Sequence, residues 1–150
     1  MIKSIAISAL LLLSGFTNAQ SKTTIDSLWI VTTYLQAIQK SIPKETHKVA
    51  LTMKQLDSLI GLGNQQKQML ERQLNVIISD KPKEINDFLK QYDLVLQSAV
   101  VLKTDLQQNQ FGTKQTNEEM AYLDKKSAYL INKLYFYAKY WKSKIEEDTH

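Results

Sequence analysis

The sequence predicts an all-α fold: an elongated antiparallel bundle of about four helices with coiled-coil-like seams, after a cleaved signal peptide. Hydrophobic residues recur at alternating spacings of three and four, a period that places them on one face of a helix. The chain of 150 residues has only four glycines and two prolines. Because it has few places to turn, a few long helices are favoured over many short strands.

The N-terminus has the pattern of a secretory signal peptide. Lys3 provides the positive charge, residues 5–13 the apolar run, and Thr17-Asn18-Ala19 the small-residue cleavage site. The apolar run is too short for a permanent membrane span. We therefore expect residues 1–19 to be removed and residues 20–150 to form a single helical-bundle domain. An uncleaved anchor is the alternative.

Composition excludes several classes of function. No cysteine is present, which rules out disulfides, thiol catalysis, thiolate metal sites and lipoprotein acylation. Without Lys3 the 19 basic residues become 18 against 15 acidic ones, a formal charge of +3. These charges are mixed along the sequence, whereas nucleic-acid binding needs a concentrated basic face. We expect an exported bacterial protein, periplasmic or secreted, that binds no nucleic acid.

The first helix is predicted to end at Pro43, because proline pushes the preceding residue out of helical geometry. Trp29 lies at the edge of its apolar face. That face consists of Leu28, Val31, Leu35, Ile38 and Ile42. A short corner at residues 41–44 is expected to lead into the second helix.

From Lys44 the same spacing predicts a second helix that reaches Ile77. Its apolar phase continues across Gly61-Leu62-Gly63-Asn64. Two glycines cost a helix about 2 kcal/mol relative to alanines, and Gly63-Asn64 would suit a left-handed cap. The unbroken phase favours one long helix with a kink or weak point here, with a break as the alternative. The glutamines of this stretch, Gln66 among them, are expected on its polar face.

Part of this second helix resembles a known family. The run Gln65-Gln66-Lys67-Gln68-Met69-Leu70 is similar to the glutamine- and leucine-rich heptads of the minor-pilus, adhesin-like subunits of conjugative type IV secretion systems. The resemblance covers residues 53–74 at most. It implies an elongated helical bundle that acts by assembly, as a component of a secretion or conjugation apparatus, and it transfers no functional residue.

Ser79-Asp80-Lys81-Pro82 predicts the start of a third helix, since proline suits the first helical turn. A broad apolar face runs from Ile85 to Leu106, and Gly112 is the expected C-terminal stop.

The fourth helix is expected to organise the bundle. Thr116-Asn117-Glu118-Glu119 has the pattern of a capping box, in which a hydroxyl and a carboxylate each bond the other residue's exposed amide. The seam that follows consists of Leu123, Ser127, Leu130, Leu134, Tyr137 and Trp141. Beside it runs an aromatic stripe of Tyr122, Tyr129, Phe136 and Tyr140.

No residue set indicates a catalytic or metal site. The two histidines, His47 and His150, lack the pattern of ligands that a metal site needs, and no Glu-x-x-His pair occurs. Phosphate loops, nucleophile elbows and zinc-protease motifs are absent from the sequence. We expect no cofactor and no metal. An enzyme, the least favoured class, would need carboxylates that only the fold brings together.

Residues 134–142 are rich in aromatic and lysine side chains, more than the seam alone needs. We predict an exported, non-catalytic helical protein that acts by protein–protein binding or assembly in the bacterial cell envelope, with a protein partner or a second copy. The predicted contacts are Tyr129, Phe136, Tyr140 and Trp141. The alternative, with a membrane surface not favoured, is a peripheral membrane- or glycan-binding protein that uses this C-terminal aromatic and lysine segment.

Overall fold

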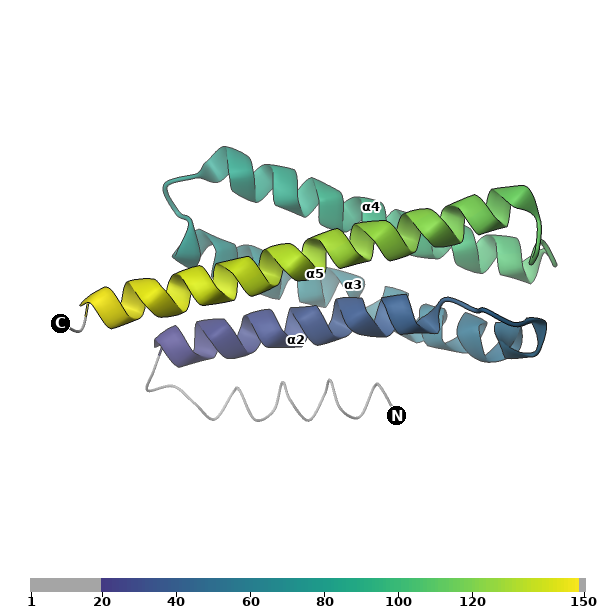
Figure 1. Ribbon diagram of the computed structural model, residues 1–150, viewed down its shortest axis with the longest axis horizontal. Helices are drawn as coiled ribbons and strands as arrows, with labels where there is room; N and C mark the ends of the chain where they lie inside the picture. The colour runs from purple at the N-terminus through teal and green to yellow at the C-terminus, as the bar shows by residue number, and fades with distance from the viewer. Residues whose placement is uncertain (1–19, 149–150) are drawn as a thin grey trace.

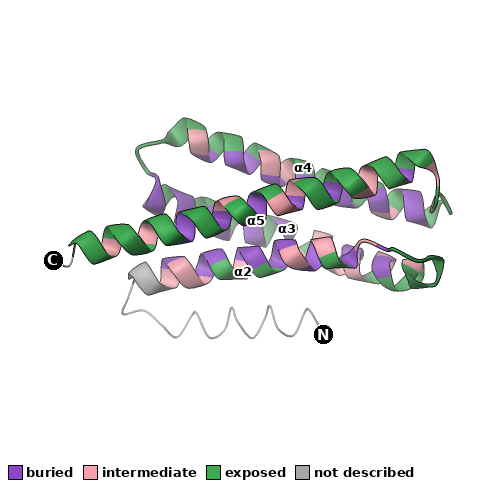
Figure 2. Cartoon of the chain, in the orientation of Figure 1, coloured by how far each residue is buried: buried purple, intermediate pink, exposed green. Residues whose placement is uncertain are grey.

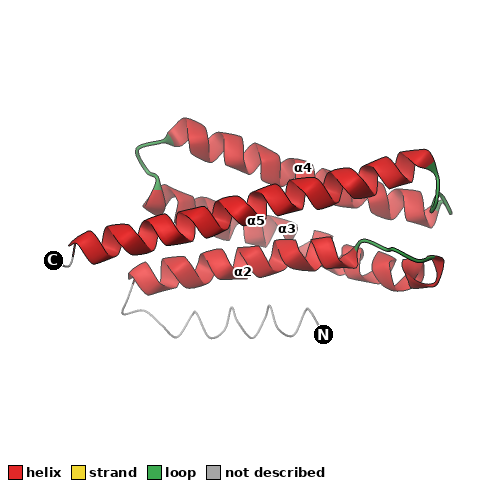
Figure 3. Ribbon diagram, in the orientation of Figure 1, coloured by secondary structure: helices red, strands yellow, loops and turns green. Residues whose placement is uncertain are grey.

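A computed structural model describes residues 20–148, and the predicted signal peptide, residues 1–19, lies outside this part. The described chain forms four long α-helices and one short 3-10 helix, with no strand (Figure 3). Successive helices run in opposite directions (Figure 1). The elements are α2 (Gln20–Ser41), η1 (Thr46–Lys48), α3 (Val49–Ile77), α4 (Pro82–Gln107) and α5 (Lys114–Asp148). The predicted all-α class and the four packed helices are confirmed.

The helices close into a four-sided bundle. The main contacts are α2 with α3, α3 with α4, α4 with α5, and α2 with α5, so the first and last helices lie side by side. Buried residues gather on the inner faces (Figure 2). Each helix contributes leucines that are fully buried, such as Leu35, Leu70, Leu102 and Leu130. One continuous apolar core therefore forms between the four helices.

The corner between α2 and α3 lies where proline predicts it. Helix α2 ends at Ser41, two residues before Pro43. The second helix begins at Val49 and not at the expected Lys44, because a 3-10 turn comes first. The Thr52 hydroxyl donates to the Ser41 carbonyl at 2.9 Å, which satisfies a carbonyl at the open end of α2.

Helix α3 is continuous through both of its glycines, as the unbroken apolar phase predicts. Gly63 is buried where α3 is approached closely by its neighbours. A Cβ atom on Gly63 would lie 2.8 Å from Leu96 Cδ1 and 3.4 Å from the Tyr34 hydroxyl oxygen. A Cβ atom on Gly61 would meet nothing within 4 Å. Gly63 thus allows close helix packing, and Gly61 lies on an open surface.

The predicted stop at Gly112 is wrong, because α4 ends earlier, at Gln107. Asn109 adopts a left-handed conformation with φ 56°. The Gln110 amide donates to the Asp105 carbonyl at 2.9 Å, and the Asn109 amide donates to the Leu106 carbonyl at 3.2 Å. This pair of bonds is a Schellman motif, in which asparagine takes the position that glycine usually occupies.

The predicted capping box at residues 116–119 is also wrong. Helix α5 begins one turn earlier, at Lys114, and Thr113 caps it: the Thr116 amide donates to Thr113 Oγ1 at 3.2 Å. Thr116 is itself fully buried. The Glu119 carboxylate accepts a hydrogen bond from the Ser98 hydroxyl of α4, so it joins two helices.

Candidate partner-binding site

Helix α5 keeps a row of aromatic side chains on its outer surface. Their exposed fractions range from 38% to 59%, although the neighbouring seam residues Leu123, Leu130 and Leu134 are buried. We call this row the aromatic face: Tyr122, Tyr129, Phe136 and Tyr140. Because the bundle closes its core without them, these rings are available to something outside the core.

Ring contacts fix the middle of the aromatic face. Phe136 stacks on Tyr140 with centroids 6.5 Å apart and planes 13° apart. Phe136 also meets Tyr137 edge to face at 5.8 Å, and Tyr137 meets Phe88 of α4 in the same way at 5.8 Å. Phe136 and Tyr140 are therefore supported by a buried ring pair and need little ordering when they meet a partner.

Three of the four predicted contacts are exposed: Tyr129, Phe136 and Tyr140. The fourth, Trp141, is less exposed than these three. Trp141 is half-buried and packs against the core, with its indole N–H enclosed and without a hydrogen-bond partner in the described chain. The Lys144 ammonium lies 5.8 Å from the indole centroid. Trp141 is therefore less available to a partner than the other three predicted contacts, because it is only partly exposed.

Tyr135 lies on the other flank of α5, toward α2. Its ring meets Trp29 edge to face at 5.0 Å, and its hydroxyl accepts a hydrogen bond from Gln36 Nε2 at 3.4 Å. This aromatic pair is engaged between two helices of the bundle. It is separate from the aromatic face, although the sequence places Tyr135 next to Phe136.

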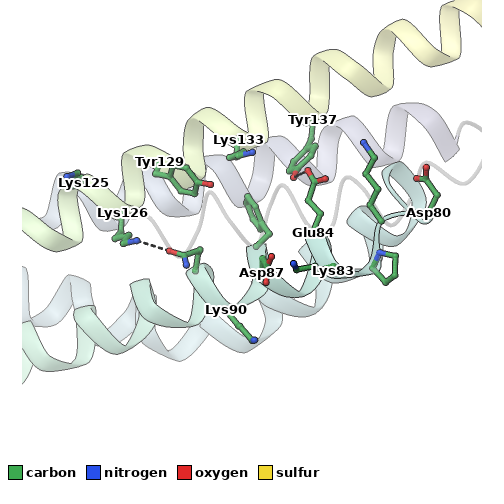
Figure 4. Close-up of a pocket in the computed structure, with 14 residues that line it drawn as sticks. Asp80, Lys83, Glu84, Asp87, Lys90, Lys125, Lys126, Tyr129, Lys133 and Tyr137 are labelled. Carbon is green, nitrogen blue, oxygen red and sulfur yellow. Dashed lines mark hydrogen bonds between the residues drawn. The ribbon is translucent and has the colours of Figure 1, made fainter.

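A groove of about 970 Å³ lies between α5 and the start of α4, and Tyr129 lines it (Figure 4). Six of its lining residues are lysines, three from each side. We call it the lysine groove, after Lys81, Lys83, Lys90, Lys125, Lys126 and Lys133. Its carboxylates, Asp80, Glu84 and Asp87, all come from α4 and the turn before it. The wall supplied by α5 has lysines and tyrosines only, so positive charge exceeds negative charge in the groove.

A hydrogen bond joins the two walls at the base of the groove. The buried Tyr137 hydroxyl donates to Glu84 Oε1 at 2.6 Å. Burial raises the pKa of the Tyr137 phenol above its ordinary value, and the neighbouring Glu84 carboxylate raises it further. Tyr137 is therefore a neutral donor at physiological pH, and the pair links α4 to α5.

Most of the groove lysines are not used within the bundle. Lys126 donates to Gln91 Oε1 at 2.8 Å. Within the described chain the other five form no ion pair: Lys81, Lys83, Lys90, Lys125 and Lys133. The sequence patterns did not reveal this groove, because its two walls come from separate segments of the chain, residues 80–91 and 125–137. The only signal of this groove in the sequence was the presence of several lysines in each of these two segments.

Residues 20–148 contain no group of three or more histidine, aspartate or glutamate side chains that could hold a metal ion. None of the described helices combines the length and apolarity of a membrane span. No family model, curated protein or solved structure matches this chain.

Proposed function

We propose that this protein is an exported, non-catalytic binding subunit of the bacterial cell envelope, which contacts a protein through the aromatic face of α5. The observation that carries this proposal is the exposure of Phe136, 59%, and of Tyr140, 40%, on a bundle whose core is already closed. Aromatic side chains are enriched at protein interfaces, and tyrosine is among the residues that contribute most to binding.

Two further features support a contact by assembly. Phe136 and Tyr140 present a stacked pair to solvent, and the lysine groove adjoins them through Tyr129 and Tyr137. An apolar centre with charged side chains at its border is the usual composition of a protein interface. The resemblance of the second helix to conjugative minor-pilus subunits implies that the assembly belongs to a secretion or conjugation apparatus.

A photo-crosslinking experiment in the native host tests this proposal. A photoreactive phenylalanine at Phe136 should give a crosslinked species of defined mass that contains this chain and a protein partner. The same residue at Gln68, which is exposed on the outer side of α3, is the matched control and should give none. Absence of any protein adduct at Phe136 would contradict a protein-binding role.

A double substitution tests the same surface by loss of binding. Phe136→Ala with Tyr140→Ala should abolish the crosslinked species or self-association and leave the helical circular dichroism unchanged, since both rings are exposed. Loss of the fold in this variant would mean that the two rings belong to the core and would remove the aromatic face as a docking surface.

The lysine groove favours one alternative function, binding to an anionic membrane surface or glycan. Lysines beside tyrosine rings suit such a surface, with the ammonium groups near the anions and the rings in the interface. Co-sedimentation with vesicles of anionic phospholipid tests the membrane form. Binding that Lys125→Glu and Lys133→Glu abolish would support it, and no binding would dispose of it.

Export is the other part of the proposal. Its support is the N-terminal pattern that ends in Thr17-Asn18-Ala19. Mass spectrometry of the protein recovered outside the cytoplasm should give Gln20 as the first residue. A chain that keeps Met1 in the cytoplasmic fraction would contradict export.

A further inference from the structure

We infer, on the basis of the proposed function, that the partner of the aromatic face is a second copy of this chain. In this arrangement two α5 helices pack antiparallel, with Phe136 of one copy against Phe136 of the other. The acidic last turn of each α5 then enters the lysine groove of the other copy. The inference rests on the order of side chains along α5, on their charges and on the position of its C-terminal turn.

The side chains that the contact needs lie on one face of α5. Lys125, Tyr129, Phe136, Tyr140 and Glu147 follow one another at spacings of four, seven, four and seven residues. These spacings correspond to whole turns of an α-helix, so the five side chains form a single row. Of this row, Phe136 is the most exposed large hydrophobic residue in the described chain.

The row is self-complementary about Phe136. Lys125 precedes Phe136 by eleven residues and Glu147 follows it by eleven, about 16 Å along the axis in each direction. In an antiparallel pair centred on Phe136, Lys125 of each copy is therefore level with Glu147 of the other. Tyr129 is level with Ser143, seven residues on the other side, and the small serine leaves room for the ring. A twofold axis makes each of these contacts twice.

The charges match the same arrangement. Lys125 and Lys133 form no ion pair within residues 20–148, and the same holds for Glu147 and Asp148. Both acidic residues are exposed at the C-terminal end of α5, where the helix dipole adds negative charge. An acidic turn on the same helix as the lysine wall favours a second copy over an unrelated acidic partner, because one surface supplies both halves of the contact.

Helix α5 is also long enough for its last turn to reach the lysine groove of a second copy. Its last turns extend past the end of the bundle (Figure 1), and among the described residues 142–148 only Ile145 is partly buried. The row from Lys125 to Glu147 is about 33 Å long. A contact between two single helix faces is small for a specific interface, so we expect a dimer that dissociates on dilution and in high salt.

Charge exchange with sedimentation velocity tests the register. Lys125→Glu and Glu147→Lys should each weaken the dimer about tenfold, since each change places two like-charged pairs in the interface. The double variant should dimerise more tightly than either single variant. Lys54→Glu, an equal charge change at an exposed site of α3, is the matched control and should leave dimerisation unchanged. A double variant no tighter than the single variants would overturn the register.

Cysteine crosslinking tests the direction of the two helices, and the chain has no native cysteine to interfere. A mixture of Lys125→Cys chains and Glu147→Cys chains should form a disulfide-linked dimer of the two types. Lys125→Cys chains alone should not, whereas a parallel pair would link them.

Failure of this inference is distinguishable from failure of the proposed function. A protein that is monomeric at every concentration, yet crosslinks from Phe136 to a different protein in the host, overturns the second copy and keeps the binding role. A crosslink from Phe136 to another copy of this chain supports both. A monomer without any crosslink overturns both.

Discussion

Tyr34 and Tyr92 bind successive turns of α3 from two different helices. The Tyr34 hydroxyl, from α2, donates to the Leu59 carbonyl at 2.6 Å. The Tyr92 hydroxyl, from α4, donates to the Gly63 carbonyl at 2.8 Å, one turn further along. Both rings are buried, so the two hydroxyls fasten the flanking helices to the glycine-containing part of α3. The segment that is weakest in helix propensity is thus held by tertiary contacts.

The two glycines of α3 should respond differently to alanine. Gly61→Ala should stabilise the protein by about 1 kcal/mol, because alanine has the higher helix propensity and its Cβ meets nothing within 4 Å. Gly63→Ala should forfeit this gain, since its Cβ would lie 2.8 Å from Leu96 Cδ1. Urea unfolding of both variants measures the difference. Equal stabilisation by the two substitutions would show that the approach to Gly63 is not tight.

Three buried tyrosines predict a loss of stability at alkaline pH. Burial raises the pKa of Tyr34, Tyr92 and Tyr137 above the ordinary value. Above a pH of about 10 the unfolded chain loses these protons while the folded chain keeps them, so the free energy of unfolding falls. Below that pH their contribution is fully present. Each such tyrosine contributes a slope of about 1.4 kcal/mol per pH unit.

Phenylalanine variants check this slope. Tyr92→Phe should lower stability at neutral pH by about 1 kcal/mol, from the lost hydrogen bond. It should also make the alkaline decline shallower by about 1.4 kcal/mol per pH unit. Tyr140→Phe, at an exposed ring, is the matched control. Parallel declines for Tyr92→Phe and the parent protein would rule out a role for the buried phenol.

The fold was largely predictable, because the apolar spacing of three and four determines both the helices and their inner faces. The exact ends of the helices were less predictable. Two threonines three residues apart, Thr113 and Thr116, can each begin a helix, and local sequence alone favours Thr116 because Glu119 follows. Tertiary packing makes Thr113 the N-cap, because Thr116 is buried and the Glu119 carboxylate accepts a hydrogen bond from Ser98 of α4.

The candidate site was predictable only in part. The exposed rings of α5 follow from its period, but the lysine groove depends on which helix lies beside α5 in space.

Gln66 shows that periodicity is also insufficient within one helix. Between Gly63 and Leu70 the alternating spacing predicts Lys67 on the inner face of α3, although a spacing of three would place Gln66 there. Both are polar, so their hydrophobicity does not distinguish them. The structure buries Gln66 and pairs Lys67 with Asp93 at 2.9 Å, which corrects the expectation that Gln66 is on the polar face.

The cap of α5 can be tested by one substitution. Thr113→Ala should destabilise the protein by about 1 kcal/mol, because the Thr116 amide loses its acceptor. Thr113→Asp should restore most of this loss. Gln115→Ala, an exposed change in the same first turn, should alter stability by less than about 0.5 kcal/mol. If thermal unfolding of Thr113→Ala matches that of the parent, another group caps the helix.

The Tyr137–Glu84 bond should stabilise the contact between α4 and α5 at the groove. A double-mutant cycle with Tyr137→Phe and Glu84→Ala should give a coupling energy of about 1 kcal/mol, moderated by the partial exposure of Glu84. The same cycle with Asp87→Ala in place of Glu84→Ala should give a coupling near zero. Additive effects in the first cycle would mean that the hydrogen bond contributes nothing to stability.

Gln66 presents the reverse case, a polar side chain whose replacement should stabilise the protein. It is 0% exposed, and neither its Nε2 nor its Oε1 has a hydrogen-bond partner in the described chain. An amide removed from water without compensation costs about 1–3 kcal/mol. Methionine has a similar length and flexibility without the amide. Gln66→Met should therefore raise the free energy of unfolding by about 1–2 kcal/mol in urea titration.

The control for Gln66 is Gln68→Met on the same helix. Gln68 is exposed, so this change alters helix propensity and composition equally but removes no buried amide. We expect it to change stability by less than about 0.5 kcal/mol. A Gln66→Met variant that is less stable than the parent would contradict this prediction. It would mean that the buried amide is hydrogen-bonded in solution and that these hydrogen bonds stabilise the fold.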